Sequence, residues 1–369
     1  MKKVITAIVA FVVVALMAFG YMEAVKHREH TGDKKFDPKE TIFEHLGDAY
    51  GWELPFNHSV RIPLPIIVLD QQNGIHCFMS SEVTDGGTCQ GFYIAHEGDY
   101  AGKVVGTDAN GKEYRPLDFS ITKNAAGIFI SAVLVVLMVF SIRNWYKKHN
   151  MKAPRKFTGA LEMLVEFVYH DTIRPIMGKE APKYGPYLLT CFFFILTMNL
   201  LGLIVIFPGG ANLTGNLAVT MVLALATFLV TNLTGNREYW KEIFWPDVPV
   251  ALKLPLMPVI EFFGIFTKPF ALMIRLFANM MGGHMVVIVF FSLIFIFGGM
   301  FGAAVGAATS VFSLAFALFM LLLDTLVSFI QAYVFTILST MFIFMAHPQH
   351  HGAEHEQITE ELKQTIKNN

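Results

Sequence analysis

The chain has 369 residues, of which 54% are hydrophobic and only 15% are charged, and its formal net charge is −1. Charged residues make up about a quarter of an ordinary soluble domain, so this composition excludes a wholly soluble protein. The near-zero net charge also excludes the global basic field that nucleic-acid binding needs. Because polar residues gather in 23–123 and much of 126–346 is apolar, we expect an all-α polytopic membrane protein with one small polar region near its N-terminus.

Residues 1–22 begin with Lys2 and Lys3, continue as an apolar run and contain small residues at Ala18 and Gly20. This is the pattern of a secretory signal peptide, although the run is also long enough for an uncleaved N-terminal anchor. Both interpretations keep the two lysines inside and send residue 23 onward to the outside.

Residues 23–123 are expected to form an extracytoplasmic region that contains β-strands. Residues 61–74 resemble a strand that ends in a turn, and later glycine pairs indicate further turns. Cys77 and Cys89 lie in this exported region, where disulfides persist, so they are candidates for a bridge, whereas Cys191 lies in an apolar span and is expected to serve packing. The histidines of the region are scattered and indicate no catalytic site.

A first span is expected at residues 126–142, and six basic residues follow it: Arg143, Lys147, Lys148, Lys152, Arg155 and Lys156. Such a cluster marks the cytoplasmic side, in agreement with the N-terminal lysines. Residues 157–177 place apolar side chains at helical spacing beside Glu162 and Glu166, which predicts an amphipathic helix on the cytoplasmic surface.

Two further spans are expected, residues 187–207 toward the outside and 217–233 back again, and the segment 235–247, with Arg237 and Lys241, is then cytoplasmic. The last two apolar segments, 255–297 and 303–346, each exceed 40 residues. A straight helix of that length measures about 60 Å, twice the hydrocarbon thickness, so these segments predict a long, tilted antiparallel hairpin.

The chain is thus expected to contain about five transmembrane helices after its N-terminal segment. We divide it into a signal peptide or anchor (1–22), an extracytoplasmic region (23–123), a membrane domain (124–346) and a cytoplasmic tail (347–369). The tail carries four histidines that could bind a metal, but a solvated tail is the simpler interpretation: His347, His350, His351 and His355.

The first arm of the hairpin carries charges at unusual depth. Glu261, Lys268 and Arg275 are seven residues apart, which brings each to within about 20° of the same helix face. Arginine cannot lose its proton, and placing it at the bilayer centre costs about 2.5–3.5 kcal/mol. Arg275 has small neighbours and no acid close to it on its stripe, so it is expected to face a membrane-embedded carboxylate of a partner subunit.

Further polar residues lie near mid-depth on both arms. Asn279 follows Arg275 by one turn, His284 faces elsewhere on the same arm, and a stripe on the second arm holds Asp324, Ser328 and Gln331. Such residues can simply join helices through hydrogen bonds, each of which stabilises helix association by about 1 kcal/mol. An acid, an imidazole and amides together are instead typical of a proton path.

Several motifs in the same order resemble subunit a of the F-type ATP synthase, the stator proton channel beside the rotating c-ring. They are "IRLFANM" at 274–280, "SFIQAYVFTILST" at 328–340, "PRKFTGALEMLVEFV" from residue 154, "MNLLGLI" from residue 198 and "NLTGNLAVTMVLAL" from residue 212. The resemblance covers about residues 120–346. It implies a non-catalytic subunit without a cofactor, in the bacterial inner membrane, whose partners are the c-ring, peripheral stalk subunit b, the rest of the ATP synthase and lipid.

The resemblance also implies roles for single residues. Arg275 corresponds to the family's essential arginine, and Asn279 and Gln331 to the amides near it. His284 and Asp324 hold the places where many bacterial members have an acid and a histidine, so the two groups look exchanged.

In the implied mechanism, protons enter from outside through a half-channel lined by Glu261, His284, Asn279 and Asp324. They reach a c-ring carboxylate, which Arg275 later ionises, and they leave through a cytoplasmic half-channel. The main alternative is a self-contained secondary transporter, which would show internal repeats that the two arms lack. A membrane enzyme would need a nucleophile with a base, or a metal cluster.

Overall fold

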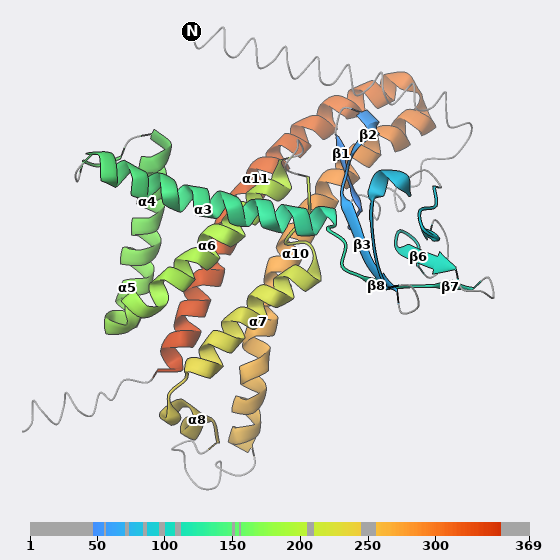
Figure 1. Cartoon of the computed structure of the whole chain (residues 1–369). Coiled ribbons are helices and arrows are strands. Elements are labelled where there is room, and N and C mark those ends of the chain that lie inside the picture. Colours follow the sequence, from blue (N-terminus) through green and yellow to red (C-terminus); the bar gives the residue numbers. More distant parts are fainter. Residues whose placement is uncertain are drawn as a thin grey trace, which may run out of the picture.

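The computed structural model describes residues 47–347, except 55–56, 71–73, 84–86, 96–99, 108–111, 150–151, 155, 205–209 and 245–255. The expected signal peptide or anchor and the tail beyond His347 lie outside the described residues. In chain order, short strands come first and long helices follow (Figure 1).

Antiparallel strands fill the first part of the described chain, which confirms the expected β-containing region. The strands are β1 (Gly51–Leu54), β2 (Asn57–Pro63), β3 (Pro65–Asp70), β4 (Gly74–Met79), β5 (Phe92–Ile94), β6 (Val104–Thr107), β7 (Glu113–Tyr114) and β8 (Leu117–Asp118). They form a β1–β2 hairpin, a β4–β3–β8 sheet and a β5–β6–β7 sheet, and a short 3-10 helix, η1 (Ser80–Glu82), follows β4.

The two three-stranded sheets share a small apolar core. Alternate residues of β3, Ile66 and Val68, are fully buried and pack with Phe78 of β4 against Phe92 and Val104 of the other sheet. Because side chains alternate along a strand, the residues between them face the opposite side of the sheet.

Cys77 and Cys89, the two candidates for a bridge, are both free and lie on different sides of the strand that holds Cys77. Cys77 lies between two inward residues of β4 and is exposed on the outer face of its sheet. Cys89 pairs with Phe92 on the core side, and its Sγ donates a hydrogen bond of 2.8 Å to Glu82 Oε2. That bond raises the pKa of the Cys89 thiol.

Helices make up the rest of the described chain, and five stretches are long and apolar enough to cross a membrane, as expected. The helices are α3 (Lys123–His149), α4 (Lys156–Val168), the π-helical η3 (Tyr169–Ile173), α5 (Arg174–Met177), the 3-10 helix η4 (Gly178–Glu180), α6 (Ala181–Leu203), α7 (Leu217–Thr234), α8 (Arg237–Phe244), α10 (Leu256–Phe301) and α11 (Ala303–Met345).

The last two helices form the expected long antiparallel hairpin, which α3 crosses steeply in Figure 1. α11 has 43 residues and would measure about 65 Å at 1.5 Å per residue, so it has to be tilted to remain in a bilayer. Near the tip, a Cβ atom at Gly306 would lie 2.9 Å from the Cα of Gly298, so glycine lets the arms approach closely.

α6 lies at the centre of the bundle, because its apolar side chains are buried on several faces. Phe192, Ile195 and Met198 are fully buried, and they share a core with Leu276 of α10 and Phe335 of α11. α6 ends, and α7 begins, beside the first turns of α3. We call this end of the bundle, next to the strands, the strand end, and the opposite end the α8 end.

Candidate functional site

A small pocket, partly open to the surroundings, lies between α6, α10 and α11. It collects five of the residues that the sequence predicts for proton transfer: Asn279, His284, Asp324, Ser328 and Gln331. Asn199 of α6 also lines it, together with apolar side chains. The hairpin therefore brings together polar groups that are up to 52 residues apart.

Amide side chains join the helices around this pocket. Asn279 Nδ2 donates a 2.7 Å hydrogen bond to Gln331 Oε1, which links the two arms of the hairpin. Asn199 Nδ2 donates to the Ser328 carbonyl over 3.4 Å, and its Oδ1 accepts a 2.7 Å bond from the Thr214 hydroxyl. Sequence reasoning did not single out Asn199 and Thr214, although "MNLLGLI" and "NLTGN" contain them.

Asp324 reaches across the hairpin toward the backbone of α10. A Cβ atom at Gly283 would lie 2.6 Å from Asp324 Oδ1, so only glycine leaves room for the carboxylate. Gly283 precedes His284, which brings the acid and the imidazole into one pocket.

His284 points toward α6 at the strand end. A Cβ atom at Gly202 would lie 3.7 Å from His284 Nε2 and 3.3 Å from the Ala211 carbonyl oxygen. His284 Nε2 and Gln331 Nε2 are buried without a hydrogen-bond partner in the described part of the chain. Within those residues, His284 and Asp324 share the pocket but form neither a hydrogen bond nor an ion pair with each other. Water is the usual partner of such buried polar groups.

Arg275 lies outside this pocket, on an exposed face of α10. It makes no hydrogen bond or ion pair with the residues that the structure describes. Its helix neighbours Leu272 and Leu276 are buried, so the backbone is fixed while the guanidinium points away from the bundle. Ala271 and Ala278 are exposed beside it, and the small side chains leave the charge accessible to another molecule.

Glu261 lies far from His284 and Asp324. It precedes Arg275 by 14 residues, about 21 Å along the helix, and it is exposed near Tyr239 of α8. Burial raises the pKa of the Tyr239 hydroxyl, and the negative charge of Glu261 raises it further. The structure thus separates Glu261 from the other residues of the expected entry half-channel.

A second small pocket lies near the α8 end between α7, α8, α10 and α11. Its polar lining comes from Thr227, Thr231, Asn232, Tyr239 and Lys268. The Tyr239 hydroxyl donates a 3.2 Å bond to Asn232 Oδ1, and Lys268 Nζ lies 5.9 Å from the ring centroid of Phe342. Lys268, on the stripe of Arg275, therefore faces this pocket.

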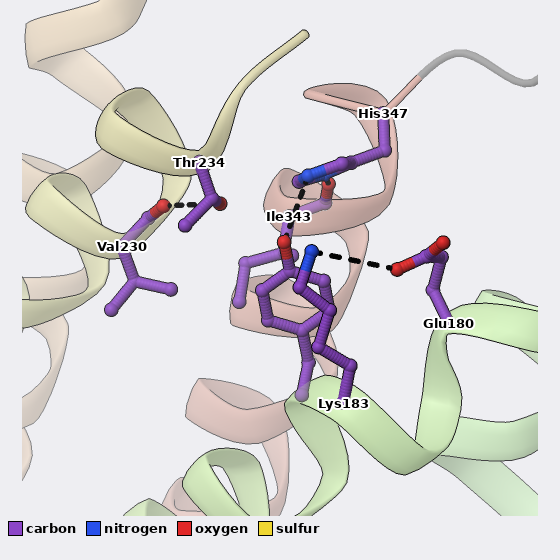
Figure 2. A network of polar contacts seen from close by, with 7 residues as sticks. Glu180, Lys183, Val230, Thr234, Ile343 and His347 are labelled. Atoms are coloured by element: carbon purple, nitrogen blue, oxygen red, sulfur yellow. Dashed lines mark hydrogen bonds and ion pairs between the residues drawn. The ribbon is translucent and has the colours of Figure 1, made fainter.

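Figure 2 shows the end of α11 beside α6 and α7, where His347 is buried. Its Nδ1 lies 2.8 Å from the Ile343 carbonyl oxygen, and its Nε2 lies 2.8 Å from the Tyr184 hydroxyl. A carbonyl only accepts, so Nδ1 carries the proton, and a neutral ring accepts from Tyr184 at Nε2. His347 thus ties α11 to α6. The other tail histidines lie outside the described residues.

Two sequence models match the chain. The model described as "ATP synthase A chain" matches residues 127–344, and a domain of unknown function, DUF8433, matches residues 41–119. ATP synthase subunit a of Chloroherpeton thalassium is 42% identical over 185 residues, which cover 49% of this chain and 54% of the relative. The subunit of Myxococcus xanthus is 44% identical over 190 residues, which cover 49% of this chain and 60% of the relative.

The chain spans about half the length of these curated relatives. The first sequence model covers well over half of the chain and includes both arms of the hairpin, with Arg275, His284 and Asp324. The chain therefore belongs to the ATP synthase A chain family.

Proposed function

We propose that this chain is the stator subunit a of the membrane sector of an F-type ATP synthase, where it couples proton flow to rotation of the c-ring. Family membership supports this function. The observation that carries it is the exposed Arg275, which has no ion-pair partner among the described residues and lies on a membrane-spanning helix.

The physical argument concerns the cost of that charge. A guanidinium keeps its proton, and in the middle of a bilayer it costs about 2.5–3.5 kcal/mol without compensation. A carboxylate on a neighbouring c subunit compensates it. The same attraction stabilises the ionised carboxylate, so each rotor acid that reaches Arg275 releases its proton. The fixed charge also repels protons that would otherwise pass directly between the two half-channels.

The pocket of His284 and Asp324 is the entry half-channel in this proposal. It lies toward the strand end, where α6 ends beside the first turns of α3. Water between the imidazole, the carboxylate and the Asn279–Gln331 pair would carry protons toward the rotor. The strands then face the outside of the bacterial inner membrane, as the basic residues after the first span require.

The second pocket is the exit half-channel. It lies near the α8 end, on the cytoplasmic side in this orientation, and its lining is polar. Glu261 belongs to this half-channel, because it lies near Tyr239, which lines the second pocket. A carboxylate there accepts protons that the rotor acid releases.

The energy for rotation comes from the membrane potential, about 2.3 kcal/mol for each charge that crosses 100 mV. This subunit makes and breaks no covalent bond. Its proposed partners are the c-ring, peripheral stalk subunit b and the remaining subunits of the ATP synthase.

Cross-linking tests the proposed rotor contact. A variant with a single cysteine at position 278, in a background of Cys77→Ser, Cys89→Ser and Cys191→Ala, is combined with c subunits that carry a cysteine beside their carboxylate. We expect oxidation to form an a–c dimer. A matched variant with the cysteine at Val136, on an exposed face of α3, should form none. No a–c dimer from position 278 in an assembled complex would contradict the proposal.

A further inference from the structure

The outer face of the β4–β3–β8 sheet is apolar and exposed. The strand register places residues side by side in rows across this face. One row holds Ile75, Leu69 and Leu117. The next row holds Cys77, Ile67 and Phe119, the residue that follows β8. Ile75 is 74% exposed, Leu117 58% and Phe119 66%. None of these six positions holds a charged side chain.

This composition is unusual for a face that meets water. An antiparallel sheet with one solvated face normally alternates apolar residues inside with polar residues outside. Here the inward row of the same strands contains the polar residues, since His76 and Asp118 flank Val68. His76 Nδ1 donates to Gln90 Oε1, and Asp118 accepts from the Tyr50 hydroxyl, so these inner polar groups are hydrogen-bonded inside the strand region. The apolar outer face therefore calls for a partner of its own.

The sheet lies close to the start of a membrane span. Lys123, the first residue of α3, follows Asp118 of β8 by five positions, so their Cα atoms lie at most about 18 Å apart. The Lys123 amide donates to the Ala49 carbonyl, and the Asn124 amide donates to Asp48 Oδ1. These bonds hold the strands against the first turn of the helix.

The arrangement of the two sheets turns the apolar face toward the helices. The other sheet covers the inner face of β3 and β4 through the core of Ile66, Val68, Phe92 and Val104. Figure 1 shows β6 and β7 on the side away from α3, and β3 on the side of the helices. The outer face of β3 and β4 thus lies on the side where α3 enters the membrane.

We infer that this sheet face rests on the lipid surface of the bilayer. It would continue the lipid-facing surface of α3, whose exposed side chains include Phe129, Val133 and Leu137. The headgroup region is about 5–8 Å thick on each side, and apolar faces at this boundary enter it by about 5–10 Å. The strand region would then be a membrane-resting platform that limits the tilt of α3 and of the bundle attached to it. This inference needs only a membrane-spanning α3 and does not depend on the proposed function.

The native Cys77 allows a direct test, because its thiol lies on the proposed lipid face and is exposed. Full-length protein with Cys89→Ser and Cys191→Ala is labelled at Cys77 with an environment-sensitive fluorophore and placed in phosphatidylcholine vesicles. A second set of vesicles contains phosphatidylcholine brominated near the glycerol end of its acyl chains. The control carries Cys77→Ser and Glu113→Cys, with the label on β7, away from the helices.

We expect the label at Cys77 to have blue-shifted emission and to lose most of its intensity in brominated vesicles, while the label at position 113 does neither. A blue shift without quenching would mean that protein covers the face, and it would overturn the inference. Emission typical of water would also overturn it. Circular dichroism and gel filtration, unchanged by labelling, ensure that the folded protein is compared.

Discussion

Asp324 and Gly283 lie against each other across the hairpin, because a Cβ atom at Gly283 would be only 2.6 Å from Asp324 Oδ1. A Cβ atom at the neighbouring Gly282 would meet no atom within 4 Å. Alanine therefore fits at position 282 but would collide with the Asp324 carboxylate at position 283. Substituting each glycine in turn can thus distinguish an effect on the position of Asp324 from an effect on the flexibility of α10.

The first prediction concerns this pair of glycines. Gly283→Ala should displace the Asp324 carboxylate from the pocket and strongly reduce ATP-driven proton pumping in membrane vesicles. Gly282→Ala should leave pumping close to normal, since the added methyl group meets no atom within 4 Å. Equal loss in both variants would show that helix flexibility, and not the position of Asp324, matters here.

The second prediction concerns the acid and the imidazole of the entry pocket. His284→Ala and Asp324→Ala should each reduce pumping about tenfold or more, because a positioned proton-transfer group contributes about 10²–10⁴-fold to a rate. The exchanged variant His284→Asp/Asp324→His keeps both groups in the pocket and should pump better than either single variant. If the exchanged variant pumps as poorly as the single variants, the two side chains do not act together.

The third prediction concerns acid stability of the strands. Burial alone would raise the pKa of Asp118, but hydrogen bonds from Ser120 and Tyr50 outweigh it and lower the pKa. A carboxylate with a lowered folded pKa stabilises the fold above its unfolded pKa, about 3.9, and this stabilisation is lost as pH falls through the folded value.

Tyr50→Phe should therefore move the acid unfolding of residues 112–120 to a higher pH, as measured by hydrogen exchange in the full-length protein. Tyr93→Phe is the matched control, because Tyr93 donates a 2.6 Å bond to Glu113 at an exposed site. An exposed bond of this kind contributes little, so the control should not shift the transition.

The fourth prediction concerns the end of α11. Tyr184→Phe leaves the buried Nε2 of His347 without its donor and should lower the free energy of unfolding by about 1–3 kcal/mol. Lys183→Ala removes the exposed ion pair of 3.8 Å with Glu180, visible in Figure 2, and the contact of Lys183 Nζ with the Tyr184 ring, 4.9 Å from its centroid. Both are exposed interactions of a flexible side chain, so this variant should change the stability by about 1 kcal/mol or less. Thermal unfolding in detergent measures both, and a Tyr184→Phe protein as stable as the parent would contradict the role of His347.

Much of the fold could be predicted from the sequence, because membrane spans are encoded in continuous apolar runs. The apolar segment expected at 303–346 is one long helix, α11 (Ala303–Met345), and its residues 307–346 contain no glycine or proline to interrupt it. The ends were less accurate: the span expected at 126–142 is part of the longer α3 (Lys123–His149). Its extra turns carry polar residues, which hydropathy alone does not include.

The site was only partly predictable. The seven-residue stripe and the motif around Arg275 identified the important helix faces, since a helix fixes them locally. The sequence could not show that Asn199 joins the pocket or that Glu261 lies elsewhere, because both depend on how α6 and α8 pack against the hairpin. Nor did it show that Cys77 faces outward from its sheet while Cys89 packs against the core, which depends on register and packing.

The role of Arg275 is tested most directly by Arg275→Ala, with Arg275→Lys as the variant that keeps the charge but changes its geometry. Both are measured in the assembled complex in membrane vesicles, for ATP-driven proton pumping and for passive proton leak. We predict that Arg275→Ala abolishes pumping while the complex still assembles, and that passive leak rises as the barrier between the half-channels is lost. Pumping near the wild-type rate in Arg275→Ala would contradict the proposed function, because the arginine would then be no more than a structural residue.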